Sequence, residues 1–175
     1  ALPSSSNNTI TCNTFVNAGL FGGYQNMVKD NIVNGKPLVY LEDVSDYTVE
    51  DAGQVILVNC TNITVKNLNL SRTGMGIILL NTKDSKILNN TASNHMAGIY
   101  LISSCNNTLK SNNISSNVGG IALSDSSNNS ITGNNVCNNY EEGIILSDSS
   151  NNTITGNNVS NNMNGIRLSS SSNNN

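Results

Sequence analysis

The segment GIALSDSSNNSITGNNVCNNYEE (120–142) is followed directly by GIILSDSSNNTITGNNVSNNMN (143–164), and the two share most of their residues. Units of the same kind open at Gly76, Gly98, Gly120, Gly143 and Gly165, with spacings of 22, 22, 23 and 22 residues. A more diverged unit begins at Gly53, and a partial unit lies at 5–19. Self-similarity at this period is typical of a solenoid, in which each unit buries its apolar face against its neighbours.

Apolar residues occupy fixed columns of these units. Short alternating runs such as Gly-Ile-x-Leu and Thr-Ile-Thr indicate strands, and the Asn, Ser and Gly clusters between them indicate turns. We therefore predict an all-β fold, a right-handed, single-stranded parallel β-helix (β-solenoid) with about 22 residues per rung. The predicted core ladder consists of Ile77, Ile99, Ile121, Ile144, Ile166, Leu79, Leu101, Leu123, Leu146 and Leu168.

The 36 Asn residues have a structural interpretation in such a fold. Rungs stack about 4.8 Å apart, so equivalent Asn residues lie above one another, and their amides can donate and accept along the axis. Asn also tolerates the left-handed backbone that tight corners require.

Composition excludes several classes of protein. Charged residues make up 11% of the 175 residues, the net charge is −3, and only eight residues are Lys or Arg. This balance argues against a nucleic-acid partner. The longest apolar runs fall far short of the roughly 18 residues of a membrane span.

We predict a single domain over 1–175. Residues 1–19 form a partial first rung, 20–52 an irregular insertion or lateral cap, and 53–175 the regular rungs. The insertion holds six of the eleven acidic residues and three of the five Tyr. A structureless loop of this length is unusual in a compact domain, so the segment covers a face or has strands of its own.

The insertion is also where a ligand site could lie, with Glu42, Asp43 and Asp46 as candidates. A second candidate is the pair Asp125 and Asp148, which fall one rung apart; solvated turn residues are the plainer interpretation of this pair. The outward position two after each Gly holds Ile78, Tyr100, Ala122, Ile145 and Arg167, which is not a carboxylate cluster. We predict no catalytic residue, no metal site and no cofactor.

His95 is the only His and stands in a corner column otherwise filled by Asn, so we expect an exposed substitute for Asn. Met75, Met96 and Met163 lie near the ends of their units and are expected to fill the core. The four Cys residues fall in positions that do not suit a disulfide within the chain. Among the Asn-x-Ser/Thr sequons, Asn106, Asn128 and Asn151 are corner sites that could carry glycan.

The pattern GIxLxxSxxNTITxNNxxxN resembles the β-helix repeat of the pectate-lyase-like superfamily, and in particular the NosD-type repeats of archaeal and bacterial surface proteins. The stretch 34–71 resembles the entry segment of such proteins. The resemblance implies the fold strongly and the function weakly, because this fold hosts lyases, hydrolases, adhesins and fibres.

Three functions stay open. The first is a non-enzymatic, extracellular or cell-surface building block of a layer, sheath or fibre. The second is a carbohydrate-binding or polysaccharide-cleaving module that uses the 20–52 insertion. The third, implied by the resemblance, is an accessory factor in copper-site assembly. Expected partners are a polysaccharide or glycan, and a second copy stacked head-to-tail through open terminal rungs.

Overall fold

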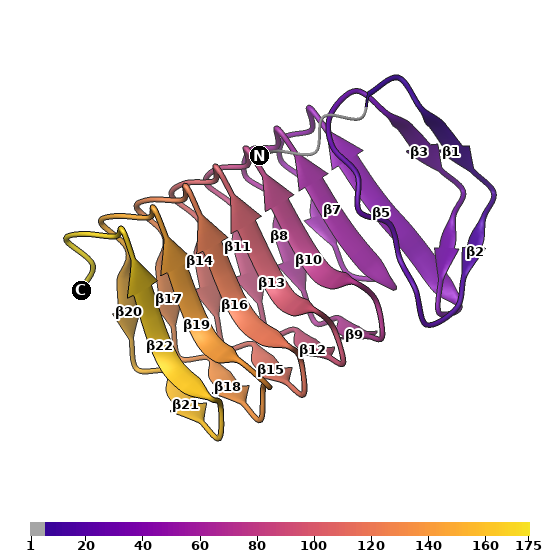
Figure 1. Cartoon of the computed structure of the whole chain (residues 1–175). Helices are drawn as coiled ribbons and strands as arrows, with labels where there is room; N and C mark the ends of the chain where they lie inside the picture. Colours follow the sequence, from indigo (N-terminus) through magenta and orange to yellow (C-terminus); the bar gives the residue numbers. More distant parts are fainter. Residues whose placement is uncertain (1–5) are drawn as a thin grey trace.

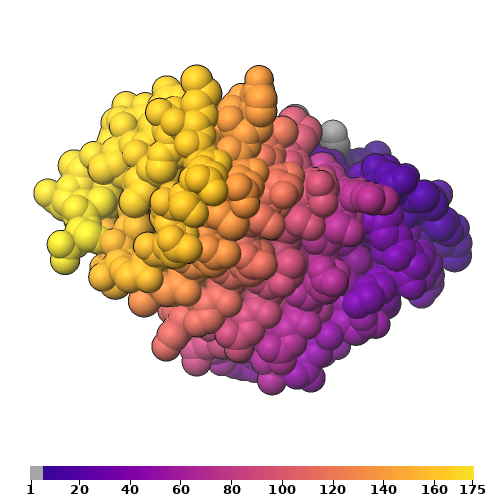
Figure 2. All heavy atoms as spheres, turned by 90° about the horizontal axis from the view of Figure 1, so that it is seen from below, coloured from indigo at the N-terminus to yellow at the C-terminus, as the bar shows by residue number. Residues whose placement is uncertain are grey.

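The structure, a computed structural model, describes residues 6–175 and shows a right-handed parallel β-solenoid of about seven turns with about 22 residues per turn. Successive turns wind side by side along the axis (Figures 1 and 2). Within residues 6–175 the strands form four sheets. No helix in this part of the chain is long and apolar enough to cross a membrane.

The longest sheet carries one strand from each regular turn and two strands of the N-terminal segment, and three smaller sheets complete the described part of the chain. Its strands, in spatial order, are β2 (Thr14–Phe15), β4 (Ile32–Val33), β5 (Lys36–Glu42), β7 (Gln54–Val58), β10 (Met75–Leu80), β13 (Ala97–Ile102), β16 (Gly119–Ser124), β19 (Glu142–Ser147) and β22 (Asn164–Ser169). The second sheet holds β6 (Thr48–Val49), β8 (Thr64–Lys66), β11 (Lys86–Leu88), β14 (Thr108–Lys110), β17 (Ser130–Thr132) and β20 (Thr153–Thr155). The third holds β9 (Asn69–Ser71), β12 (Thr91–Ser93), β15 (Asn113–Ser115), β18 (Asn135–Cys137) and β21 (Asn158–Ser160), and the last pairs β1 (Thr9–Thr11) with β3 (Met27–Lys29).

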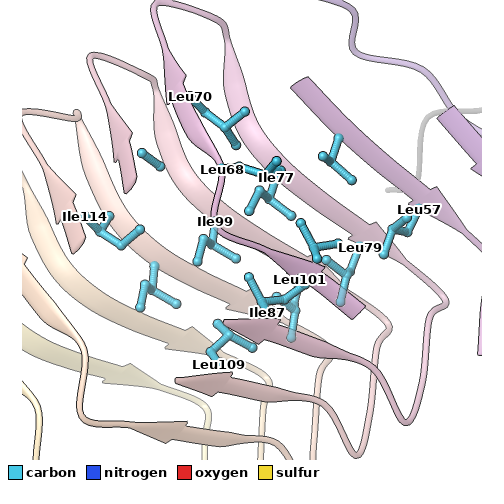
Figure 3. Packing of buried hydrophobic residues seen from close by; sticks show 14 of the residues in the cluster. Leu57, Leu68, Leu70, Ile77, Leu79, Ile87, Ile99, Leu101, Leu109 and Ile114 are labelled. Atoms are coloured by element: carbon cyan, nitrogen blue, oxygen red, sulfur yellow. The ribbon is translucent and has the colours of Figure 1, made fainter. Parts of the chain in front are cut away.

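The interior of the solenoid is an apolar column. Ile77, Ile99, Ile121 and Ile144 are paired from rung to rung and have no exposed surface. Figure 3 shows how the neighbouring Leu and Ile side chains point into this column. Ile166 and Leu168 correct the prediction of a buried ladder: they continue it in register but are 49% and 52% exposed, because β22 has a neighbouring strand on one side only.

The register differs from the sequence alignment at one place. Val55 pairs with Ile77, so Gln54, and not Gly53, occupies the column of Gly76. The Gln54 side chain is buried and bonds the backbone N–H and C=O of Leu20, at 2.9 and 2.8 Å. It therefore fastens the segment before β3 to the outside of the solenoid.

This fastened segment covers the outer face of the first rungs. Ile56, Ile78 and Leu80 point outward and yet are fully buried, since side chains that include Phe15, Leu20, Tyr24 and Val28 pack with them in a second apolar cluster. Ile78 is thus part of a second core and not of an open face.

The N-terminal end is built differently from the other rungs. Asn34 and Gly35 have φ of 49° and 82°, as a two-residue type I′ hairpin requires, and they join β4 to β5 in antiparallel pairing. β2 then pairs parallel with β4 (Figure 1). β2 and β4 therefore run opposite to β5, so residues 6–35 do not repeat the parallel rung of the later turns; head-to-tail stacking stays a prediction.

Polar ladders line the corners. Residues with φ near +50° to +60° turn the chain, and from Asn59 to Asn151 each of them is followed by a buried side chain. The buried members are Thr82, Ser104, Ser126 and Ser149; Ser85, Asn107, Asn129 and Asn152; Asn90, Asn112 and Asn134; and His95, Asn117 and Asn139. His95 therefore corrects the prediction of an exposed side chain: it is 3% exposed and takes the buried place of an Asn.

Candidate functional site

A cleft lies between the hairpin arms at the N-terminal end. Hydrogen bonds join β4 to β5 next to the turn at Asn34–Gly35, but β3 is not paired with β5, and the two separate (Figure 1). The space between them has a volume of about 450 Å³, within the range of small-ligand sites. Its lining residues are Val28, Lys29, Asp30, Leu38, Val39, Tyr40, Leu41, Tyr47, Thr48, Val49, Glu50 and Asp51.

The cleft has an apolar floor and an aromatic rim. Val39 and Leu41 are half-buried and pack on the interior column, and Leu38 is buried in the outer cluster. Tyr47 lies at the rim with 52% of its surface exposed. Tyrosine side chains combine a broad apolar face with a hydroxyl group, which suits the recognition of amphipathic ligands.

Charges on the rim are mostly negative. Asp30, Glu50 and Asp51 line the cleft together with one cation, Lys29. Glu50 is held by Lys66 at 3.0 Å and Asp51 by Lys36 at 3.5 Å, and all four of these side chains are well exposed. Exposed ion pairs of this kind fix side-chain positions at little net energy.

Tyr40 forms the wall that adjoins the outer cluster. Its hydroxyl lies 2.8 Å from both the Gly23 carbonyl and Glu42 Oε2, and the single hydroxyl proton can be donated to one of them at a time. Burial, followed by the nearby Glu42 carboxylate, raises the pKa of Tyr40 far above its usual value. Tyr40 is therefore a neutral hydrogen-bond donor.

The three carboxylates that the sequence offered as ligands serve the backbone and the corners. Glu42 accepts hydrogen bonds from the backbone N–H of Gln25 and Asn26, at 2.5 and 3.4 Å, and so holds the covering segment. Asp43 accepts from Asn59 Nδ2, and Asp46 accepts from Asn62 Nδ2 at 2.6 Å.

Asp43 and Asp46 also have left-handed backbone, with φ of 56° and 58°. They thus end two corner ladders, and neither lines the cleft. The sequence carried a signal for this role, since each Asp stands 16 residues before the Asn that it caps.

Asp125 and Asp148 lie at one corner, one turn apart, as the pairing of Ser124 with Ser147 requires. Both are exposed and have φ of 49°. Four turns of the same column separate Asp125 from Asp43, so the structure does not bring the two predicted groups together.

Asn106, Asn128 and Asn151 occupy the next corner column. All three are exposed, with φ of 58°, 61° and 58°. The geometry leaves their side chains accessible, and their glycosylation stays a prediction.

The cleft lies within the predicted segment but is lined by side chains other than the predicted ones. Every residue of the cleft lies in the 20–52 insertion, but the lining residues are Tyr40, Tyr47, Asp30, Glu50 and Asp51 in place of Glu42, Asp43 and Asp46. The Asn-Gly turn at 34–35 was the available signal, because it fixes which residues form the facing arms.

Comparison with known proteins places the chain in a family. The family model described as "Periplasmic copper-binding protein (NosD)" matches residues 6–175. The chain belongs to the NosD family. No curated protein matches this NosD-family chain.

Among solved structures, this NosD-family chain is similar to a mutant of the periplasmic alginate epimerase AlgG, with a TM-score of 0.54 and 16% identity. The match covers 95% of the chain and 49% of the epimerase, so the chain spans about half of that structure. At this identity the likeness shows the fold alone.

The residues of this NosD-family chain do not fit a copper centre. Within residues 6–175 no group of three or more His, Cys, Asp or Glu side chains could hold a metal ion. His95 is buried in a corner ladder. Cys60 is also buried, and its thiol lies within hydrogen-bond distance of the carbonyl oxygens of Leu41 and Val58. Burial also raises the pKa of Cys60, which disfavours the thiolate that copper would need.

Proposed function

We propose that this NosD-family solenoid is a non-catalytic glycan-binding module located outside the cytoplasm, and that the cleft between β3 and β5 holds a short stretch of polysaccharide. The observation that carries the proposal is the pairing of an apolar floor with an aromatic rim, Tyr47, at the mouth of a cleft of about 450 Å³. Sugar rings pack their apolar faces on such rims, while hydroxyl groups bond the surrounding polar side chains.

The charges of the cleft indicate the kind of sugar. Asp30, Glu50 and Asp51 line the cleft with Lys29, and Lys66 and Lys36 pair with Glu50 and Asp51 from outside, so no excess of positive charge faces a ligand. An acidic polysaccharide such as alginate needs an excess of cations for complementary charge, which this cleft does not supply. A neutral glycan suits it better, with the carboxylates accepting hydrogen bonds from sugar hydroxyls.

Binding without cleavage is what we infer for this site. Glu50 and Asp51 are each tied to a lysine outside the cleft, and both are exposed. A general acid works from a partly desolvated setting, and these two exposed side chains do not have one.

The test is calorimetric titration of the intact protein with a panel of neutral and acidic oligosaccharides. Tyr47→Ala should weaken binding of a neutral member about tenfold or more, since the aromatic face is lost. Phe21→Ala is the matched control, because Phe21 is equally exposed at 52% and lies outside the cleft. An absence of binding across the panel, or equal effects of the two substitutions, would overturn the proposal.

A second proposal is a structural role in a cell-surface layer or fibre. It is favoured by the unbroken ladders from β5 to β22, which give a rigid rod with a repeating edge. Electron microscopy of the purified protein distinguishes the two proposals, since ordered fibres that form without glycan would favour the structural role.

A further inference from the structure

Four large apolar side chains form a line on the outside of one corner. Met96, Val118, Tyr140 and Met163 follow one another from turn to turn just before β13, β16, β19 and β22, at the lower turns in Figure 1. They are 64%, 41%, 79% and 77% exposed. We call these four residues the corner ridge.

The corner ridge corrects the prediction that Met96 and Met163 fill the core. The interior at this corner is already occupied by His95, Asn117 and Asn139, each the residue before a ridge member. The ridge side chains therefore contribute little to the fold. Contiguous exposed apolar surface of this kind marks an interaction site.

A notch stands at one end of the corner ridge. Gly74 occupies the same column one turn before Met96, whose backbone N–H bonds the Gly74 carbonyl at 2.8 Å. A Cβ atom on Gly74 would meet nothing within 4 Å. Going along the axis, the column therefore presents the notch at Gly74, then Met96, Val118, Tyr140 and finally Met163.

Opposite charges stand beside Gly74 and beside Tyr140 in this column. Arg72 is exposed two residues before the notch, and Glu141 is exposed next to Tyr140. None of the ion pairs formed within residues 6–175 includes either residue. Between Gly74 and Tyr140 the column has a notch with a cation at one side and a large side chain with an anion at the other, and this stretch is complementary to itself when reversed, with Met163 lying beyond it.

We propose that the corner ridge is the interface of an antiparallel two-fold dimer, in which Tyr140 of each copy packs over Gly74 of the other. The reversed order then sets Met96 against Val118 twice, and Arg72 of one copy lies near Glu141 of the other. Both copies have the same spacing between turns, so each ridge residue can meet its partner all along the interface. The two-fold axis makes the assembly a closed dimer.

Electrostatics selects this direction. Two copies side by side in parallel would place Arg72 against Arg72 and Glu141 against Glu141, whereas the antiparallel dimer opposes unlike charges at both ends. The dimer uses the corner ridge and leaves the cleft at the N-terminal end uncovered, so it does not depend on the glycan proposal.

Sedimentation velocity of the intact protein over a range of concentrations tests the dimer. Tyr140→Ser should weaken it about tenfold or more, since the aromatic side chain that packs over Gly74 of the other copy is lost. Tyr47→Ser is the matched control, an exposed tyrosine away from the corner ridge, and should leave the dimer unchanged. A protein that stays monomeric at all concentrations overturns the proposal.

Charge exchange tests the direction. Arg72→Glu and Glu141→Arg should each weaken the dimer, and the double variant should restore it. Circular dichroism and the thermal midpoint check that each variant keeps the solenoid. Failure of the double variant to recover, with its fold intact, would show a different register and overturn the antiparallel arrangement.

Discussion

The Asn129 side-chain oxygen accepts a hydrogen bond from the backbone N–H of Asn107, one turn earlier, at 2.9 Å. Its Nδ2 group donates to the Ser104 carbonyl at 3.0 Å and to Asn152 Oδ1 at 3.2 Å. One buried amide thus satisfies groups on both neighbouring turns. The left-handed corner residue Asn106 takes the following N–H out of the strand pairing, and the ladder amide replaces the lost partner.

Asn129→Leu should therefore destabilise the protein strongly. The change leaves the buried N–H of Asn107 and the Ser104 carbonyl without these partners, and each unsatisfied buried group costs about 1–3 kcal/mol. Asn128→Gly is the control, because Asn128 is exposed with φ of 61°, a backbone conformation that Gly adopts freely. Urea unfolding measures both, and similar losses of stability would contradict the ladder argument.

Ile144→Ala tests the apolar column. Ile144 has no exposed surface and is paired with Ile121 and Ile166 in the neighbouring turns, so its truncation should cost about 2–5 kcal/mol through cavity formation. Ser147→Ala, three residues later on the outward side, should cost little. The midpoints of thermal unfolding of the two variants are compared with that of the parent protein. Equal shifts would show that the inward and outward sides of the strand are assigned wrongly.

Gly143→Ala and Gly165→Ala place the same extra methyl group at equivalent positions of two successive turns, of which Gly143 is covered by the next turn and Gly165 is in the last one. A Cβ on Gly143 would lie 2.7 Å from each of Asn162 Nδ2, the Gly165 carbonyl and Val159 Cγ1, so the turns must move apart. On Gly165 the nearest contact would be Val159 at 3.8 Å, an ordinary distance. We expect a loss of about 1–3 kcal/mol for Gly143→Ala and much less for Gly165→Ala, measured by urea unfolding.

His95 should make stability depend on pH. Its burial lowers its pKa below the ordinary 6.5, so the folded protein binds the proton more weakly than the unfolded chain. Its contribution is complete above about pH 6.5 and is lost as the pH falls toward the lowered pKa.

His95→Asn should reduce this acid sensitivity and add on the order of 1 kcal/mol, because His95 Nε2 is buried without a hydrogen-bond partner within residues 6–175. The matched column members Asn117 and Asn139 show that Asn fits the position. Unfolding free energies at pH 7.5 and pH 5 should differ less for the variant than for the parent. An unchanged difference would mean that other groups cause the acid effect.

The repeat determined what could be predicted from the sequence. Ile77, Ile99, Ile121 and Ile144 recur at one spacing, and a stacked unit offers one inward place for them, so the prediction of the solenoid and its core is confirmed. The N-terminal part follows no repeat. Ile78 points outward and is buried only because Leu20 and Tyr24 pack over it. The local sequence around Ile78 does not indicate that these distant residues cover it.

The corner ridge escaped prediction for a different reason. Period-two alternation holds along a strand but stops at a corner, where His95 turns inward and Met96 outward because the chain bends between them. Apolar character alone could not separate Met96 from the core. The buried Asn before each of Val118 and Tyr140 was the clue, since two successive residues at a bend cannot both fill the same interior place.

The ladder bonds join residues one turn apart in sequence wherever they lie along the axis: 22 residues between Ser85 and Asn107, and 23 between Asn129 and Asn152. Sequence separation of contacts therefore does not grow as turns are added, and the relative contact order falls with length. Tandem duplication of one 22-residue segment would give every ladder a new partner of the old kind. One unit is 23 residues long, and its extra residue lies at the bend before Glu142. A one-residue insertion at a bend leaves the pairing of the strands unchanged. The protein can thus lengthen by genetic repetition without redesign of its interior.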